Sequence, residues 1–354
     1  MINLQTPTNF LVSKNSGKVA LHLQNLYTVR MKVKIKREEI EKALAEYEVG
    51  TLEASPQEIR GDTNLNFKIF TSTGPYFLKY IQDTNELPLF EYLGDLHQQL
   101  LLSEVTVPRI YKNKQGKYVT NRFQLYKFID GESKKEWSEK ELMSVARNFA
   151  HLHNALEKIT VPEIVKNKTD DFVKAESVSY VRENIMPKLE KLTTDLYIKE
   201  EIAETLRILK KSLVGYETLP KHIIHGDLNE SNALFKQSRN VAVLDITLKN
   251  EALVYDLGIF LYWWCFPWWT KRMDLKRLEI LLTAYEQVRR LTRREKILLP
   301  YLILRRSFLD LTLPVLRYYR GALNKKELGD TLQGIIVRNQ EIRACIPQIL
   351  ENIL

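Results

Sequence analysis

The sequence predicts an α+β protein with two lobes, a small lobe built on an antiparallel sheet and a larger lobe that is mainly helical. Residues 50–129 alternate short extended segments with turn residues, and only one helical stretch interrupts them. After the polar segment DGES (130–133) the apolar spacing becomes helical and stays so through most of the chain. We therefore divide the sequence into an N-terminal extension (1–35), a small lobe (36–129) and a large lobe (130–354).

Composition and charge are those of a globular protein that attracts anions. The 354 residues are 44% hydrophobic and 27% charged, with a formal net charge of +9. Phosphates, nucleotides, nucleic acids and acidic membranes would all be attracted by this charge, so it selects none of them. The most apolar run, 257–269, is shorter than the roughly 20 residues of a membrane-spanning helix. We expect a cytoplasmic protein in which Cys265 and Cys345 stay reduced.

The small lobe is expected to contain about five strands and two helices. Residues 36–49 place Ile40 and Leu44 on one helical face, and 87–102 form a second helix with Pro88 in its first turn. Strand-like segments surround the second helix: QEIR, LNFKIFTS and YFLKYI before it, and PRIYKN, KYVT and FQLYKFID after it. This order predicts a small antiparallel sheet that one helix interrupts.

The large lobe is expected to be helical apart from one hairpin. The segment SEKE (138–141) has the form of a capping box and should open a helix that continues through LMSVARNFAHLHNAL. Helical spacing resumes over 173–215, with a break near Pro187, and again over 256–354. Between these stretches, ALF and VAVLD are predicted to form a short hairpin.

The hairpin and the segment HIIHGDLNESNALF (222–235) collect polar side chains that can carry chemistry. Asp227 and Asn232 lie on the loop, and Asp245 ends the second hairpin strand, so the hairpin folds Asp245 back beside them. A carboxylate and an amide oxygen that converge there are hard ligands, which suit Mg²⁺ when phosphate oxygens complete its shell. The remaining carboxylate, Asp227, is then free to accept a proton from an attacking hydroxyl group.

The spacing H-G-D-x-x-x-x-N over 225–232, followed by Asp245 after a strand, resembles the catalytic core of aminoglycoside phosphotransferase-type kinases, which are small-molecule relatives of the protein kinases. The acid of VYDLG (254–258) also resembles this superfamily, and the C-terminal helices look most like those of type II homoserine kinases. The resemblance implies a bilobal protein-kinase-like fold with ATP and Mg²⁺ as cofactors. It also implies that Asp227 is catalytic and that Asn232 and Asp245 are metal ligands.

The same resemblance implies that the small lobe binds the nucleotide. Lys79 of YFLKYI would bind the α- and β-phosphates of ATP, and a glutamate on the following helix would hold the lysine ammonium group in position. Glu91 is the predicted glutamate, and Glu86 and Asp95 are nearby alternatives.

Two further segments would contact the nucleotide in such a fold. The covering loop would be IRGDTNLNFKIF (59–70), in which Gly61 and Asn64 belong to a single-glycine turn. The segment LYKFIDG matches the hinge between the lobes, where the backbone groups of Lys127 and Ile129 would meet the adenine edge.

Two other features have both a structural and a functional interpretation. The tryptophans of YWWCFPWW (262–269) fit a substrate pocket and a lobe core equally well. His153 and His225 are interpreted as packing and bracing residues that do no chemistry themselves.

We predict an enzyme that transfers the γ-phosphate of ATP to a hydroxyl group of a small molecule. Residues 251–354 contain 17 Lys and Arg against 11 Asp and Glu, which favours a neutral or carboxylate-bearing acceptor, such as an amino-acid-like alcohol or a sugar. An aminoglycoside antibiotic is the alternative acceptor, and a non-catalytic nucleotide-binding pseudokinase is the alternative class. The sequence lacks the A-P-E segment of a protein kinase. We predict no nucleic-acid or membrane partner, and the oligomeric state stays open.

Overall fold

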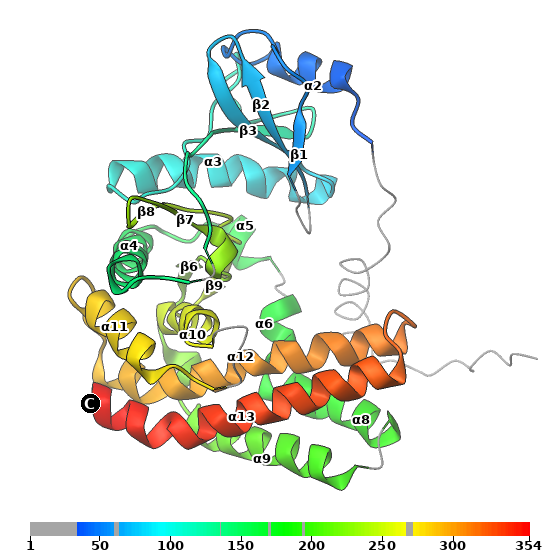
Figure 1. Ribbon diagram of the computed structural model, residues 1–354, viewed down its shortest axis with the longest axis vertical. Coiled ribbons are helices and arrows are strands. Elements are labelled where there is room, and N and C mark those ends of the chain that lie inside the picture. Colours follow the sequence, from blue (N-terminus) through cyan, green and yellow to red (C-terminus); the bar gives the residue numbers. More distant parts are fainter. Residues whose placement is uncertain (1–33, 60–63, 135, 169–170, 193–194, 267–271) are drawn as a thin grey trace, which may run out of the picture.

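The computed structural model describes residues 34–59, 64–134, 136–168, 171–192, 195–266 and 272–354 (Figure 1). The predicted N-terminal extension (1–35) lies almost entirely outside these residues. Within the described part of the chain, no helix is both long enough and apolar enough to cross a membrane.

The small lobe is a five-stranded antiparallel sheet with the order β1-β2-β3-β5-β4. This confirms the predicted sheet, although PRIYKN forms only a single bridge, between Ile110 and Tyr126, instead of a strand. The elements are α2 (Arg37–Leu44), β1 (Gln57–Ile59), β2 (Leu65–Thr71), β3 (Gly74–Tyr80), β4 (Val119–Thr120) and β5 (Phe123–Lys127).

A single long helix separates the sheet from the large lobe (Figure 1). It is α3 (Leu87–Leu102), which follows the short turn η1 (Thr84–Glu86) and carries a proline in its first turn, as predicted. The sheet and α2 share a small apolar cluster that includes Ile69 and Leu78. The buried leucines of α3, Leu93, Leu96 and Leu100, belong in contrast to the same large apolar cluster as the helices of the large lobe.

The large lobe is helical, as predicted, and its first helix begins at the predicted capping box of Ser138 and Glu141. Pro187 lies in the first turn of α8, directly after a π-helical turn, so the predicted break is a change of helix type. The helices are α4 (Glu139–Leu156), α5 (Glu163–Lys166), α6 (Asp171–Ala175), α7 (Val178–Tyr180), η2 (Val181–Ile185), α8 (Met186–Leu192), α9 (Leu196–Ser212), η3 (Tyr216–Thr218), α10 (Leu253–Trp264), α11 (Leu275–Glu286), α12 (Arg293–Tyr319) and α13 (Lys325–Ile353).

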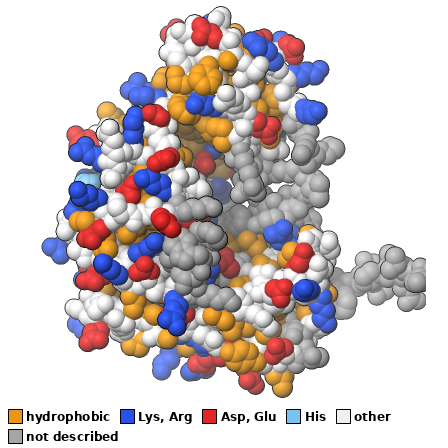
Figure 2. Space-filling model, viewed as in Figure 1, with side chains coloured by type: hydrophobic (Ala, Val, Ile, Leu, Met, Phe, Trp, Pro, Cys, Tyr) orange, Lys and Arg blue, Asp and Glu red, His pale blue; other side chains and the backbone are white. Residues whose placement is uncertain are grey.

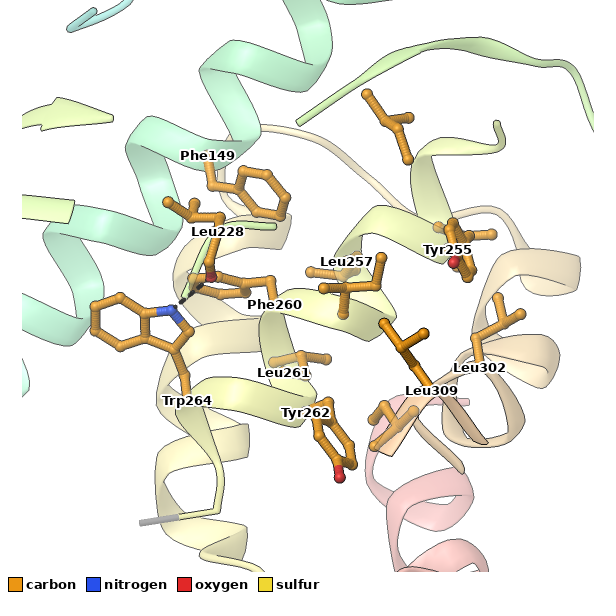
Figure 3. Packing of buried hydrophobic residues seen from close by; sticks show 14 of the residues in the cluster. Phe149, Leu228, Tyr255, Leu257, Phe260, Leu261, Tyr262, Trp264, Leu302 and Leu309 are labelled. Atoms are coloured by element: carbon orange, nitrogen blue, oxygen red, sulfur yellow. Dashed lines mark hydrogen bonds between the residues drawn. The ribbon is translucent and has the colours of Figure 1, made fainter. Parts of the chain in front are cut away.

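Helix α10 is the centre of the large core, because apolar side chains cover nearly all of its circumference (Figure 3). Phe260 packs on Phe149 of α4, with ring centroids 4.8 Å apart. Trp264 is fully buried, and its indole Nε1 donates a hydrogen bond of 3.0 Å to the carbonyl of Leu228. Of the two interpretations of the tryptophan cluster, the core is therefore correct for Trp264. Residues 267–271, which include two more tryptophans, lie outside the described residues.

Two short antiparallel pairs lie between α3 and α10. The predicted hairpin is β7 (Ala233–Lys236) with β8 (Arg239–Val243). The second pair, β6 (His222–Ile224) with β9 (Lys249–Glu251), was not predicted. The linker joins the first pair, because Glu132 and Phe235 exchange two backbone hydrogen bonds of 3.0 and 2.9 Å.

Candidate active site

The loop between β6 and β7 carries Asp227 and Asn232. The surface of the molecule is recessed between the small and the large lobe (Figure 2). The backbone of this loop is anchored on Asp256, which lies in the first turn of α10 and is fully buried. The two Asp256 carboxylate oxygens accept hydrogen bonds from the backbone N–H groups of His225 (2.7 Å) and Gly226 (2.8 Å). The acid of VYDLG therefore fixes the position of the loop.

Gly226 is required by the shape of this loop. Its φ is +75°, and an added Cβ would lie 2.5 Å from Oγ1 of Thr247 and 2.7 Å from Cδ of Lys249. Thr247 Oγ1 cannot easily move aside, since it donates to the carbonyl of His225 at 2.7 Å. A side chain at this position would push the loop away from α10.

His225 braces the loop as a neutral imidazole. Its Nε2 lies 2.8 Å from the carbonyl of Leu244, which can only accept, and its Nδ1 lies 3.2 Å from the backbone N–H of Asp227, which can only donate. The proton must therefore be on Nε2. Burial lowers the pKa of His225, in agreement with the neutral form. The interpretation of this histidine as a bracing residue fits these contacts.

His153 supports the same carboxylate from the opposite side. Its Nε2 lies 3.2 Å from Asp256 Oδ2, and its Nδ1 lies 2.6 Å from the hydroxyl of Tyr285. Burial by itself would raise the pKa of Asp256, but the hydrogen bond and charge of His153 and the amide of Gly226 lower it overall. Asp256 is therefore an ionised buried acid whose partners are all donors.

Asp227 is half-buried and has few side-chain contacts. The side-chain amide of Asn229 donates to Asp227 Oδ2 at 3.2 Å, and that of Asn232 donates to the Asp227 backbone carbonyl at 2.8 Å. Burial raises the pKa of Asp227, although the charges of Arg306, His225 and Lys249 oppose the shift. A carboxylate with a raised pKa is a better proton acceptor than an ordinary aspartate.

Lys79 and Asp245 meet across the recess, one from each lobe. Lys79 Nζ lies 2.5 Å from Asp245 Oδ1; the lysine side chain is 10% exposed and the aspartate side chain 55%. Lys79 lowers the pKa of Asp245, and Asp245 raises the pKa of Lys79 against the effect of burial. Asn66 is the cross-strand neighbour of Lys79, and its buried Oδ1 has no hydrogen-bond partner among the described residues.

Asn232 and Asp245 have the oxygen atoms that a magnesium ion would need. Because the Asn232 amide nitrogen is bound to Asp227, its amide oxygen is the end left to face a cation. The Asn232 backbone carbonyl accepts from the N–H of Leu244 at 2.8 Å, which holds it beside the residue that precedes Asp245. The described residues contain no cluster of three or more His, Cys, Asp or Glu that could bind a metal alone. The two oxygens therefore fit a cation that also binds phosphate.

The predicted partnership of Glu91 with Lys79 is wrong. The two Glu91 carboxylate oxygens accept from the backbone N–H groups of Tyr118 and Val119, each at 2.9 Å. Glu91 faces β4 from the middle of α3, so it attaches that edge strand to the helix. The acid that pairs with Lys79 is Asp245, and Glu86, one of the named alternatives, adds a weaker attraction.

The other predicted nucleotide contacts have different outcomes. Gly61 lies outside the described residues, and Asn64 uses its Oδ1 to accept the N–H of Gln82 at 3.1 Å. The N–H of Lys127 already donates to the carbonyl of Arg109 at 2.8 Å, so it cannot donate to an adenine. The backbone of Ile129 has no hydrogen bond to any described residue, and its contact with adenine stays a prediction.

A comparison with known families identifies the chain. Residues 57–291 match the family described as the phosphotransferase enzyme family, APH. The protein belongs to this family. The matched region begins at β1 and ends just before α12, so it contains the whole of the site described above. Family membership makes the protein an enzyme that transfers a phosphoryl group to a hydroxyl group of a small molecule.

Named relatives of this phosphotransferase are homoserine kinases. The enzyme of Sinorhizobium medicae is 28% identical over 275 residues, which cover 76% of this chain and 80% of that protein. The homoserine kinase of Parvibaculum lavamentivorans is also 28% identical, over 276 residues.

Solved structures confirm the protein-kinase-like fold of this phosphotransferase. A microcompartment-associated aminopropanol kinase is 15% identical with a TM-score of 0.64, and the match covers 89% of this chain and 98% of that one. Amicoumacin kinase in complex with AMP-PNP, Ca²⁺ and its substrate is 15% identical with a TM-score of 0.62, covering 89% of this chain and 95% of that one.

Proposed function

We propose that this enzyme transfers the γ-phosphate of ATP, bound with Mg²⁺, to the hydroxyl group of an amino-acid-like alcohol. The hydroxyl oxygen forms a bond to the γ-phosphorus, the bond from that phosphorus to the bridging oxygen breaks, and ADP leaves. The hydroxyl proton passes to the Asp227 carboxylate. The observation that carries the proposal is a half-buried Asp227 with a raised pKa, on a loop in which the Asn232 carbonyl accepts the N–H of Leu244, the residue before Asp245.

The remaining residues would bind the nucleotide. Lys79 would exchange its contact with Asp245 for the phosphates, and Asp245 and Asn232 would then hold the magnesium ion. The ion would neutralise negative charge that develops on the phosphate oxygens. Asn64 and the backbone of Ile129 are further candidates for nucleotide contact. Asp227 would orient the hydroxyl group for attack in line with the leaving oxygen.

The acceptor is tested most directly with a panel of hydroxyl compounds. Purified protein with Mg-ATP should release ADP fastest with hydroxy-amino acids such as homoserine, because homoserine kinases are its relatives and the basic large lobe disfavours polycations. Sugars, amino alcohols and aminoglycosides complete the panel. If only aminoglycosides are phosphorylated efficiently, the proposed acceptor class is wrong.

Asp245→Asn should weaken nucleotide binding only when magnesium is present. The substitution removes a charged ligand, which should weaken binding about 10- to 100-fold. Nucleotide titrations with and without magnesium measure this difference. The matched control is Asp330→Asn, on an exposed position of α13, which should leave both affinities unchanged. Equal affinities for wild type and Asp245→Asn in magnesium would exclude Asp245 as a ligand.

The rate of transfer should fall as the pH is lowered. Asp227 accepts a proton only when it is ionised, and burial places its pKa above the ordinary value of about 3.9. The midpoint of the decline in kcat should therefore lie above that value. His225 should add no step of its own, because its pKa is lowered and its proton is fixed on Nε2. A kcat profile with a midpoint at or below the ordinary value would contradict the role given to Asp227.

A further inference from the structure

A buried arginine, Arg306 of α12, packs against α10, the helix that also contacts the loop of Asp227. Its side chain is 7% exposed, and its guanidinium stacks on Trp263 at 5.0 Å and on Tyr262 at 5.3 Å. Trp264, the next residue of α10, donates to the carbonyl of Leu228, the residue that follows Asp227. Helix α10 therefore contacts both Arg306 and the loop of Asp227, and the charge of Arg306 lowers the pKa of Asp227 against the effect of burial.

The acids around Arg306 neutralise it only in part. Glu176 Oε1 lies 3.6 Å from its Nε, and Asp310 Oδ1 lies 3.3 Å from its Nη1, both longer than a good charge-assisted hydrogen bond. Its remaining nitrogen, Nη2, has no hydrogen-bond partner in the described part of the chain. A guanidinium group with an unpaired nitrogen can donate hydrogen bonds to a planar anion such as a carboxylate.

Both neighbouring acids are also shared with other groups. Asp310 accepts from the hydroxyl of Tyr262 at 2.5 Å and pairs with Arg338 at 3.3 Å. Glu176 accepts from the hydroxyl of Tyr255 at 2.7 Å and is attracted to Arg305 as well as to Arg306. Neither carboxylate is therefore dedicated to Arg306.

Lys249 is a second positive charge that acts on Asp227. Lys249 of β9 is buried, and its Nζ lies 3.4 Å from the carbonyl of Gly226, the residue before Asp227. The charges of Lys249 from β9 and Arg306 from α12 both oppose the rise in the pKa of Asp227. An acceptor that approaches Asp227 with a negative group of its own would meet compensating positive charge.

We propose that Arg306 binds the carboxylate of the acceptor and so selects acidic alcohols over their uncharged or cationic counterparts. This inference rests on the proposed function and adds the residue that determines specificity. The carboxylate would meet the free edge of the guanidinium, while the hydroxyl group of the same molecule meets Asp227. Arg306 is a positioning residue, since it takes no part in the transfer of the proton or the phosphoryl group.

The test compares homoserine with the amino alcohol that lacks only its carboxylate. Wild-type enzyme should strongly prefer homoserine. Arg306→Gln should lower kcat/KM for homoserine about 10- to 100-fold, mainly by raising KM, because a charge-assisted contact is worth about 1.5–3 kcal/mol. The same substitution should leave kcat/KM for the amino alcohol almost unchanged. Arg306→Lys should restore part of the preference.

Arg338→Gln is the matched control, because Arg338 shares Asp310 and Tyr262 with Arg306 but comes from α13. This substitution should leave kcat/KM unchanged for both acceptors. A measurement on wild type does not depend on the folding of any variant. The amino acid that lacks only the hydroxyl group of homoserine should compete with the acceptor, and the matching amine without a carboxylate should not.

Several outcomes would overturn the assignment. One is an equal loss of kcat/KM for homoserine and for the amino alcohol in Arg306→Gln. A second is the same selective loss of kcat/KM for homoserine in Arg338→Gln. A third is equal inhibition of the wild-type enzyme by the competing amine and the competing amino acid. Phosphorylation of amino alcohols or sugars with no preference for the acid would reject Arg306 as the carboxylate site and leave the proposed transfer reaction intact. ADP release that no hydroxyl compound stimulates would instead reject the proposed function itself.

Discussion

Substitution Asp227→Asn is expected to lower kcat by about 10²- to 10⁴-fold, the range for loss of a positioned general base. The amide keeps the size of the side chain and cannot accept the hydroxyl proton. Binding of Mg-ATP should be unchanged, because the proposed ligands, Lys79, Asn232 and Asp245, all remain. Single-turnover transfer rates and nucleotide titrations measure the two effects separately.

The same variant should be at least as stable as wild type at neutral pH. Burial raises the pKa of Asp227 in the folded state, so this group favours folding at low pH. That contribution is lost as the pH rises through the folded-state pKa, and Asn removes the cost of ionising a buried acid. The free energy of unfolding should therefore stay equal or increase.

Glu230→Gln is the matched control for Asp227→Asn. Glu230 is a half-buried acid three residues along the same loop, and its nearest charge is Arg277 of α11. This acid-to-amide change should leave kcat within a few-fold of wild type. Full activity in Asp227→Asn, or an equal loss in Glu230→Gln, would mean that the proton acceptor has been assigned to the wrong carboxylate.

Asp256→Ala is expected to cause the largest loss of stability, about 3 kcal/mol or more in the free energy of unfolding. It leaves the N–H groups of His225 and Gly226 and the Nε2 of His153 without their acceptor inside the core, and each buried unpaired donor costs about 1–3 kcal/mol. Urea unfolding at neutral pH measures the change. The folded fraction should also lose activity, because the catalytic loop is no longer fixed to α10.

Asp195→Ala provides the comparison for an aspartate that is not in the core. Asp195 caps α9 by accepting from the N–H groups of Tyr197 and Ile198, and loss of such a cap typically costs about 1 kcal/mol. Its transfer rate should stay normal. If Asp256→Ala were no less stable than Asp195→Ala, the buried carboxylate would not be the anchor of the loop.

Local signals in the sequence were sufficient for the regular elements and for the catalytic loop. The predicted helix over 87–102 has the bounds of α3, because the proline at its start and its apolar spacing both act within the helix. The capping box that opens α4 is likewise a contact between residues three apart. The hairpin predicted between Asn232 and Asp245 is β7 with β8, and the role of Asp227, Asn232 and Asp245 as one site stays a prediction.

Features that depend on distant packing could not be predicted in this way. Strand β9 is only the polar tripeptide Lys249–Glu251, and it becomes a strand because β6 pairs with it. Glu91 has the sequence position of a lysine partner, but the rotation of α3 turns it toward β4. Arg306 belongs to a pair of arginines that would ordinarily be solvated, but it is buried against Tyr262 and Trp263 of α10 and beside Glu176.

Leu93, Leu96 and Leu100 are the buried leucines of α3, and they pack into the apolar cluster of the large lobe rather than that of the sheet. If the small lobe were separated from the large lobe at the linker, the apolar face of α3 would be exposed to water. The two lobes therefore share one apolar core and are not independent modules. A new acceptor specificity must therefore come from substitutions within the large lobe. Replacing the small lobe by that of another kinase would disrupt the apolar core that α3 shares with the large lobe.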